Sequence, residues 1–315
     1  MKTRTVKTLS IGLFTGMALT ASAANTLISG DLSVGTNWDT GAPTTIGNIG
    51  IIDADNTAPN NGIMTSTALI GLYIEQTGGL VSASGITQTL DTTQYEISGG
   101  NMNINGLVLT NAASLLISGG DVALGSSGNP RSITITAGSF TITSGTLAVS
   151  NDIAVSSAGT ESDKVYNFDG GIVTVVDDMA NSFQADGTFN FSGSTSVTVG
   201  GQFGADQAAN RLVNIGLGTG SLTTGTLETR NMFIDWTSDS LFSLTATSIV
   251  QAGAASSWQN LWDAGRLTVD GIQDGTFEEN FLIVGNTLTF NNIPEPSSFL
   301  IMGLAGLGVI RRRRR

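Results

Sequence analysis

Many short runs of the chain alternate apolar and polar residues with a period of two. YEISGGNMNING from Tyr95 and YNFDGGIVTVVDD from Tyr166 are examples, in which two alternating runs flank a pair of glycines. Because successive side chains of a strand point to opposite faces, each run predicts a short strand with one buried face. Glycines between the runs permit a sharp corner where a Cβ would crowd. The pattern therefore predicts an all-β fold of short strands and tight corners.

These units recur along the chain, which favours a repetitive architecture. Six of them align on glycine at spacings of 21, 20, 19, 32 and 23 residues, at Gly78, Gly99, Gly119, Gly138, Gly170 and Gly193. Such a repeat predicts a parallel β-helix, a solenoid of roughly seven to ten coils that stack their apolar rows. We interpret the spacing of 32 as an insertion around residues 156–165 or as a coil that lost its glycine. A β-sandwich is the alternative, because it too has short strands separated by turns.

The segments beside the repeats differ from them. We assign the repeats to residues 58–210, an N-terminal cap to residues 24–57, and a C-terminal β-rich capping module to residues 211–292. The cap contains Trp38 followed by Gly41-Ala42-Pro43, and it resembles the opening segment of bacterial surface β-helix proteins. We interpret Trp38 as a buried cap residue rather than a platform for sugars.

Two elements are predicted within the C-terminal module. Apolar residues at helical spacing in 257–265, with Ser257 before them and Gly265 after them, predict one short helix. On this helix Trp258 and Trp262 share one face, and we expect them in the core. FLIVGNTLTF, residues 281–290, predicts a β-hairpin with Gly285-Asn286 as its two-residue turn.

The N-terminus has the layout of a secretory signal peptide. Lys2, Arg4 and Lys7 precede an apolar run, residues 9–19, and an A-x-A cleavage site follows. The run has 11 residues, whereas a membrane-spanning helix needs about 20. We therefore predict a short hydrophobic helix in residues 1–23 that signal peptidase removes, with Ala21 and Ala23 at its site.

The C-terminus combines a triplet, Pro294-Glu295-Pro296, with a mostly apolar run, residues 297–310, and five arginines. At about 1.5 Å per residue, a helix of that run spans about 21 Å of a hydrocarbon core about 30 Å thick. This short membrane helix is a poor permanent anchor. The arginines hold that end in the cytoplasm by the positive-inside rule, so the exported body stays on the periplasmic side. An ordinary tail anchor would explain the run and the arginines but not the triplet.

Together, in this order and at this end of the chain, the three features resemble a PEP-CTERM sorting signal of exopolysaccharide-producing Gram-negative bacteria. The resemblance covers residues 293–315. It implies recognition by exosortase, a membrane transpeptidase-like enzyme that cleaves near the triplet and passes the body to the cell surface or extracellular matrix. The sorting motif would then be Pro294, Glu295 and Pro296, and the membrane-side stop would be Arg311, Arg312, Arg313, Arg314 and Arg315. Catalytic residues for this step belong to exosortase.

Charge is distributed unevenly between the ends and the body. Eight of the 13 basic residues but only one of the 25 acidic residues lie in the two terminal segments. Residues 24–292 therefore carry 5 basic and 24 acidic side chains, a net charge of −19. So acidic a body repels phosphate backbones, which argues against a nucleic-acid partner.

Little in the sequence indicates catalysis. The absence of His and Cys excludes Ser-His-Asp triads, cysteine nucleophiles, HExxH metallohydrolases and most zinc or copper sites. The adjacent pair Asp177-Asp178 would point to opposite faces of a strand, whereas glycosidases need converging carboxylates. No lyase motif surrounds the basic residues of the body, Arg131, Lys164, Arg211, Arg230 and Arg266. We predict no catalytic residue; three carboxylates, or a basic residue beside carboxylates, gathered in one groove would favour an enzyme.

Oxygen-rich segments raise the question of calcium. Asp53-Ala54-Asp55-Asn56 and Asp177-Asp178 follow neither the EF-hand loop nor the nonapeptide of calcium-binding β-rolls. We interpret them as solvated turn carboxylates and predict no metal and no cofactor, with calcium as the lesser alternative.

These features predict an exported structural or adhesive protein of the cell surface or extracellular matrix. Its expected partners are signal peptidase, exosortase and exopolysaccharide, with transient insertion of the C-terminal helix into the inner membrane. The alternative is a carbohydrate-active enzyme of the β-helix type, a polysaccharide lyase or glycosidase.

Overall fold

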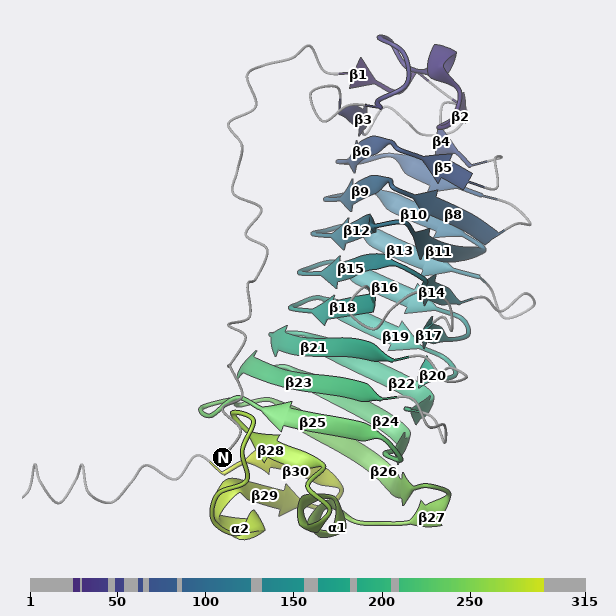
Figure 1. Ribbon diagram of the computed structural model, residues 1–315. Helices are drawn as coiled ribbons and strands as arrows, with labels where there is room; N and C mark the ends of the chain where they lie inside the picture. The colour runs from purple at the N-terminus through teal and green to yellow at the C-terminus, as the bar shows by residue number, and fades with distance from the viewer. Residues whose placement is uncertain are drawn as a thin grey trace, which may run out of the picture.

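The protein body is a parallel β-solenoid with two short α-helices and one 3-10 helix, η1 (Gly35–Asn37), among the described residues (Figure 1). The computed structural model describes residues 25–28, 30–44, 49–53, 62–64, 68–83, 87–125, 132–155, 164–181, 186–204 and 210–291. The solenoid prediction is confirmed, because the strands of successive coils pair in parallel and in register. A β-sandwich is excluded for the same reason.

One strand of each coil belongs to an 11-stranded sheet, called here the first sheet. Its strands follow one another at one position of successive coils: β1 (Asn25–Thr26), β3 (Gly50–Ile52), β6 (Tyr73–Gln76), β9 (Gln94–Ile97), β12 (Ala113–Ile117), β15 (Gly138–Ile142), β18 (Lys164–Phe168), β21 (Gly187–Gly193), β23 (Arg211–Gly218), β25 (Met232–Trp236) and β28 (Leu267–Val269).

A second ladder of parallel strands follows the first sheet in each coil. It runs through β2 (Gly30–Asp31), β4 (Gly62–Ile63), β7 (Leu80–Ser82), β10 (Asn101–Ile104), β13 (Asp121–Leu124), β16 (Thr146–Val149), β19 (Ile172–Val175), β22 (Ser196–Phe203), β24 (Ser221–Glu228) and β26 (Ser243–Gln251).

A third ladder was not predicted. It consists of β5 (Ala68–Ile70), β8 (Thr87–Asp91), β11 (Gly106–Thr110), β14 (Ile133–Ile135), β17 (Ile153–Val155) and β20 (Met179–Asn181). The 18 strands from β3 to β20 thus form six three-stranded coils. In the three coils that follow, each of β22, β24 and β26 is a single long strand that occupies the positions of both the second and the third ladder. The register of β22 with β24 shifts between Val199 and Gln202. The coil number lies within the predicted range.

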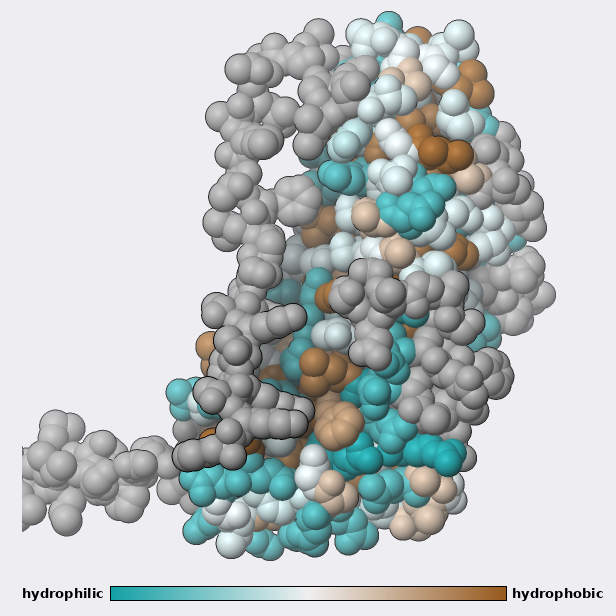
Figure 2. All heavy atoms as spheres, in the orientation of Figure 1, coloured by the Kyte–Doolittle hydropathy of each residue, from teal (hydrophilic) through white to brown (hydrophobic). Residues whose placement is uncertain are grey.

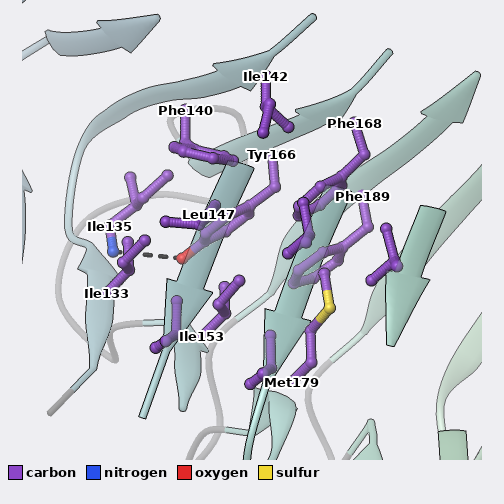
Figure 3. Packing of buried hydrophobic residues seen from close by; sticks show 14 of the residues in the cluster. Ile133, Ile135, Phe140, Ile142, Leu147, Ile153, Tyr166, Phe168, Met179 and Phe189 are labelled. Carbon is purple, nitrogen blue, oxygen red and sulfur yellow. Dashed lines mark hydrogen bonds between the residues drawn. The ribbon is translucent and has the colours of Figure 1, made fainter. Parts of the chain in front are cut away.

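Columns of inward side chains make the core. In the first sheet Phe140, Tyr166 and Phe189 are register partners in successive coils, and all three are fully buried. The rings of Tyr166 and Phe189 stack with their centroids 4.7 Å apart. The Tyr166 hydroxyl accepts a hydrogen bond from the Ile135 N–H at 3.2 Å (Figure 3) and donates one to the Ala154 carbonyl at 2.6 Å. Burial of this hydroxyl therefore leaves no unsatisfied polar group.

The corner glycines of successive coils also lie above one another in a column. The prediction that Gly138 belongs to this column was wrong. A Cβ at Gly145 would lie 2.5 Å from the Gly120 carbonyl oxygen, which identifies Gly145 as the corner residue one coil after Gly120. Gly138 instead starts β15 in the first sheet, opposite Ala113. The spacing of 32 residues arose because a glycine can lie at the corner before a strand of the first sheet or at the corner after it. Both corners separate alternating runs, so the alignment on glycine mistook the first for the second. With Gly145 in place, the chain advances 25 residues from Gly120 and 26 more to Gly171.

The N-terminal segment completes the first coils. Its strands β1 and β3 pair with each other and continue the first sheet. Trp38 is buried, as predicted, and its Nε1–H donates a hydrogen bond to the Leu32 carbonyl at 3.0 Å. The ring occupies the place where a side chain at Gly50 would lie. Asp53 is described, whereas residues 54–56 of the oxygen-rich segment lie outside the described residues.

Solenoid pairing continues past residue 210, where a separate module was predicted to begin. Strands β23, β24, β25 and β26 pair in the same parallel ladders as the coils before them. The architecture changes after β26, which pairs in antiparallel fashion with β27 (Ala254–Ala255) and β30 (Thr287–Phe290).

This terminal region contains both predicted elements and one that was missed. The helix α1 (Trp258–Asp263) has Ser257 as its N-cap, and Trp258 and Trp262 are buried, as predicted. Strands β29 (Phe281–Val284) and β30 form the predicted hairpin, with a positive φ of 62° at Gly285. The helix α2 (Phe277–Asn280) was not predicted, although Thr276 and Glu279 form a capping box.

Substitution of a corner glycine tests the close approach of the coils. A Cβ at Gly119 would lie 2.2 Å from the Ser98 carbonyl oxygen, so we expect Gly119→Ala to lower the free energy of unfolding by about 3 kcal/mol. Gly216→Ala is the matched control, because its nearest obstacle is the Ser192 Cβ at 3.2 Å, and we expect a change within about 1 kcal/mol. Chemical denaturation followed by circular dichroism measures both. Equal losses would contradict the role given to the corner.

Candidate functional site

The predicted processing sites lie at the two ends of the chain, outside the described residues. This holds for Ala21 and Ala23 and for the sorting residues Pro294, Glu295, Pro296, Arg311, Arg312, Arg313, Arg314 and Arg315. The structure does describe the end of the body that precedes the sorting residues. Strand β30 ends at Phe290, so three residues, 291–293, separate the terminal hairpin from the triplet.

Within the body, three aspartates gather where two successive coils turn from the second to the third ladder. Asp152 lies between β16 and β17, and Asp177 and Asp178 lie between β19 and β20. One carboxylate oxygen of each lies within 4.8 Å of the others. Because β16 pairs with β19 and β17 with β20, the two corners are stacked directly. We call these residues the aspartate cluster.

The prediction for Asp177 and Asp178 was wrong. Their carboxylates do not diverge to opposite faces, because the two residues lie in the connection between β19 and β20 rather than within a strand. Their partner Asp152 lies 25 residues earlier in the chain, and only the stacking of coils brings it to them. The adjacent pair could be recognised in the sequence, but nothing there indicated that Asp152 would join it.

Part of the hydrogen-bonding capacity of the cluster is used within the fold. The Asp178 N–H donates to Asp152 Oδ1 at 3.1 Å, and the Gln202 N–H of the next coil donates to Asp178 Oδ1 at 2.7 Å. Asp152 and Asp178 are partly buried, whereas Asp177 is exposed. The carboxylates therefore tie three coils together at one corner.

Electrostatics in the cluster favour the protonated form of Asp152. Burial raises the pKa of Asp152, and the charges of Asp178 and Asp177 raise it further, while the hydrogen bond from the Asp178 backbone opposes the rise. Calcium takes six to eight oxygen ligands, so three carboxylates would supply only part of such a site. That these are turn carboxylates rather than a calcium site stays a prediction.

Two basic residues of the body point into the solenoid, which sequence reasoning missed. Lys164 begins β18 and Arg211 begins β23, and both side chains are buried. Arg211 Nε donates to the Ala180 carbonyl at 3.3 Å. Burial lowers the pKa of this guanidinium, and the carboxylate of Asp186 opposes the shift. The inward orientation of Lys164 could have been predicted from the alternation of the strand, because Lys164 lies two residues before the inward-facing Tyr166.

The remaining predicted residues divide into surface and core positions. The Arg266 guanidinium lies over the Phe233 ring, 4.4 Å from its centroid. Trp236, Trp258 and Trp262 are all buried, so none of them is a platform for sugars. Arg131 lies outside the described residues.

Comparison with known proteins identifies the tail rather than the body. Residues 292–315 match a family model described as a PEP-CTERM protein-sorting motif, which confirms the resemblance seen in the sequence. No curated protein and no solved structure matches the chain. The motif implies an exported protein sorted by exosortase.

Neither α-helix of the described residues is long and apolar enough to cross a membrane.

Asp152→Asn tests the electrostatics of the cluster. The pKa of Asp152 is raised in the folded state, so its charge lowers stability as the pH rises above the ordinary aspartate value. An amide removes that charge but still accepts the hydrogen bond from Asp178. We expect Asp152→Asn to unfold at a higher temperature than the wild type at pH 7, with the difference lost below about pH 3.8.

The exposed Asp263 supplies the control, since Asp263→Asn should leave the melting temperature nearly unchanged at both pH values. Thermal melts of the three proteins, with and without added calcium, measure these effects. A lower melting temperature of Asp152→Asn at pH 7 without calcium would contradict the repulsion argument. Stabilisation by calcium of the wild type and of Asp263→Asn, but not of Asp152→Asn, would instead favour the calcium alternative.

Proposed function

We propose, from the sorting motif at residues 292–315, that this protein is a structural or adhesive component of an exopolysaccharide matrix at the cell surface. The motif is the observation that carries the proposal, because it assigns the protein to the export route of exosortase. The body supplies a stiff repetitive scaffold, since every coil is tied to the next by backbone pairing.

The outer surface of the body suits a hydrated matrix. Outward positions of the first sheet carry Asn167, Asn190 and Asn214 in register, and the second ladder carries serines and threonines. Hydrophilic and intermediate residues separate the small apolar areas on the visible face (Figure 2). The net charge of −19 across residues 24–292 would let divalent cations bridge the protein to acidic polysaccharide. The serine and threonine rows offer hydrogen bonds to glycans or sites for O-linked sugars.

In this proposal the two ends of the chain act in sequence. Signal peptidase removes residues 1–23 during export, and the short apolar run then holds the body at the periplasmic face of the inner membrane. Exosortase cleaves near Pro294-Glu295-Pro296 and releases the body toward the cell surface. The five arginines stay with the discarded tail.

Replacement of the acidic residue of the triplet tests the sorting step. We expect Glu295→Ala to leave uncleaved protein in the inner membrane, because the enzyme loses a recognition group. Glu278→Ala, on the exposed surface of α2, is the control and should be released normally. Fractionation in strains with and without exosortase, with intact masses of the released protein, measures the outcome.

The released wild-type protein should lack both the first 23 residues and the terminal arginines. Equal release of Glu295→Ala, or release without exosortase, would overturn the proposed route. Normal release of a protein that is never associated with exopolysaccharide would leave the route intact but overturn the matrix role.

The aspartate cluster favours a second candidate function, a β-helix glycosidase. Catalytic carboxyl groups of retaining glycosidases are about 5 Å apart, and carboxylate oxygens of Asp152, Asp177 and Asp178 lie within 4.8 Å of one another. A raised pKa at Asp152 suits a general acid. The bonds from backbone N–H groups to Asp152 and Asp178 favour a structural role instead, and we rank the enzyme second.

Loss of catalytic carboxylates separates the two functions. We expect the purified wild type and the Asp152→Asn/Asp177→Asn variant alike to release no reducing sugar from the exopolysaccharide of the producing strain. Hydrolysis by the wild type that falls by roughly a hundredfold or more in the variant would establish the enzyme.

A further inference from the structure

Two rows of hydroxyl side chains lie side by side on the second ladder. One row contains Ser196, Ser221 and Ser243, and the other contains Thr198, Thr223 and Thr245. We call these six residues the hydroxyl grid. Figure 1 shows their strands, β22, β24 and β26, as neighbours. Thr174 of β19 extends the threonine row on one side, and Thr287 of β30 on the other.

The grid faces outward because its neighbours in the sequence face inward. Val197, Leu222 and Leu244 lie between the two rows and are fully buried or nearly so. Ser196, Thr198 and Thr223 are exposed, and the other three members are partly exposed. Alternation along three strands therefore presents every hydroxyl on the same face.

Backbone pairing makes the grid regular. Neighbouring strands of a sheet are about 4.8 Å apart, and residues i and i+2 of a strand are about 6.6 Å apart. The register of β22, β24 and β26 is unbroken over the grid, since the shift in β22 comes after Val199. A repeating array of hydroxyls results.

Five of these six hydroxyls are available to a ligand, unlike the polar groups of the first sheet; the sixth, on Thr245, shares a hydrogen bond with the Thr287 hydroxyl at 2.8 Å. The Asn190 amide donates to Asn167 Oδ1 at 2.7 Å, and the Asn214 amide donates to Asn190 Oδ1 at 2.6 Å. That asparagine column is therefore engaged with itself. Among the hydrogen bonds of the described residues, by contrast, none involves a side-chain hydroxyl of Ser196, Ser221, Ser243, Thr198 or Thr223.

The grid is also neutral on an acidic protein. Neither row contains a charged residue from β19 to β30, whereas residues 24–292 carry a net charge of −19. Hydroxyls can both donate and accept hydrogen bonds, which matches the hydroxyls of a sugar. Phosphates and carboxylates would instead meet repulsion from the surrounding acids.

From this regularity, availability and neutrality, we propose that the hydroxyl grid binds an extended neutral polysaccharide laid along its rows. This deepens the matrix function proposed above and rests on it. Each sugar in turn meets a hydroxyl of the next coil, so weak single contacts add up along the chain. Many repeated hydrogen bonds along the polysaccharide, rather than one deep pocket, would then provide the binding.

Thr198→Val/Thr223→Val removes two hydroxyls and retains the shape and β-propensity of the side chains. Thr188→Val is the control, because Thr188 lies in β21 of the same solenoid, outside the grid, between Val165 and Leu212. The probes are amorphous cellulose and chitin, with alginate as an acidic comparison. The protein is the released form purified from culture, and depletion from solution gives its affinity.

We expect the wild type and Thr188→Val to bind a neutral probe equally, and to bind alginate less well when no divalent cation is added. The loss of two hydrogen bonds should weaken binding by Thr198→Val/Thr223→Val roughly tenfold. Ser196→Ala/Ser221→Ala should show a similar loss if the threonine variant is poorly folded by circular dichroism.

Absence of binding to both neutral probes would overturn the proposal, as would equal losses in the grid variants and Thr188→Val. Inhibition of ice growth by the grid without polysaccharide binding would also overturn it. Failure here, together with normal sorting and matrix association, would leave the proposed function standing.

Discussion

Register between successive coils is the constraint on which the rest of the structure depends. Each strand of the first sheet pairs with the strand one coil away. Each side chain therefore packs against the side chains at the same position of the neighbouring coils. Aromatic rings stack inside because Tyr166 and Phe189 are such partners. The same rule acts outside, where it aligns the asparagines of the first sheet and the hydroxyls of the second ladder. One backbone regularity thus organises both the core and the surface.

Local patterns explain what the sequence could predict. Alternation with a period of two identified the strands, recurring glycines indicated the solenoid, and Ser257 marked the start of α1. Two features depended on more than local pattern. Gly138 was misaligned because the corner before the first sheet resembles the corner after it. The third ladder escaped notice because its strands, such as β14, read as flanks of the same repeat.

The aspartate cluster shows the same limit for function. Asp177 and Asp178 were visible as a pair, but their convergence depends on the connection between β19 and β20, and Asp152 reaches them only because two coils are stacked. In a solenoid, residues one coil apart are neighbours in space although some 25 positions separate them in sequence. A candidate site is therefore found by comparing equivalent positions of adjacent coils, once their true register is known.

The short connection between the body and the sorting motif has a kinetic consequence. Three residues lie between β30 and Pro294, and a fully extended chain of that length reaches only about 10 Å. An enzyme that cuts near the triplet while the hairpin is closed must bring its active site almost against the folded end of the solenoid. Otherwise cleavage precedes closure of the hairpin, and folding of the last strands competes with release.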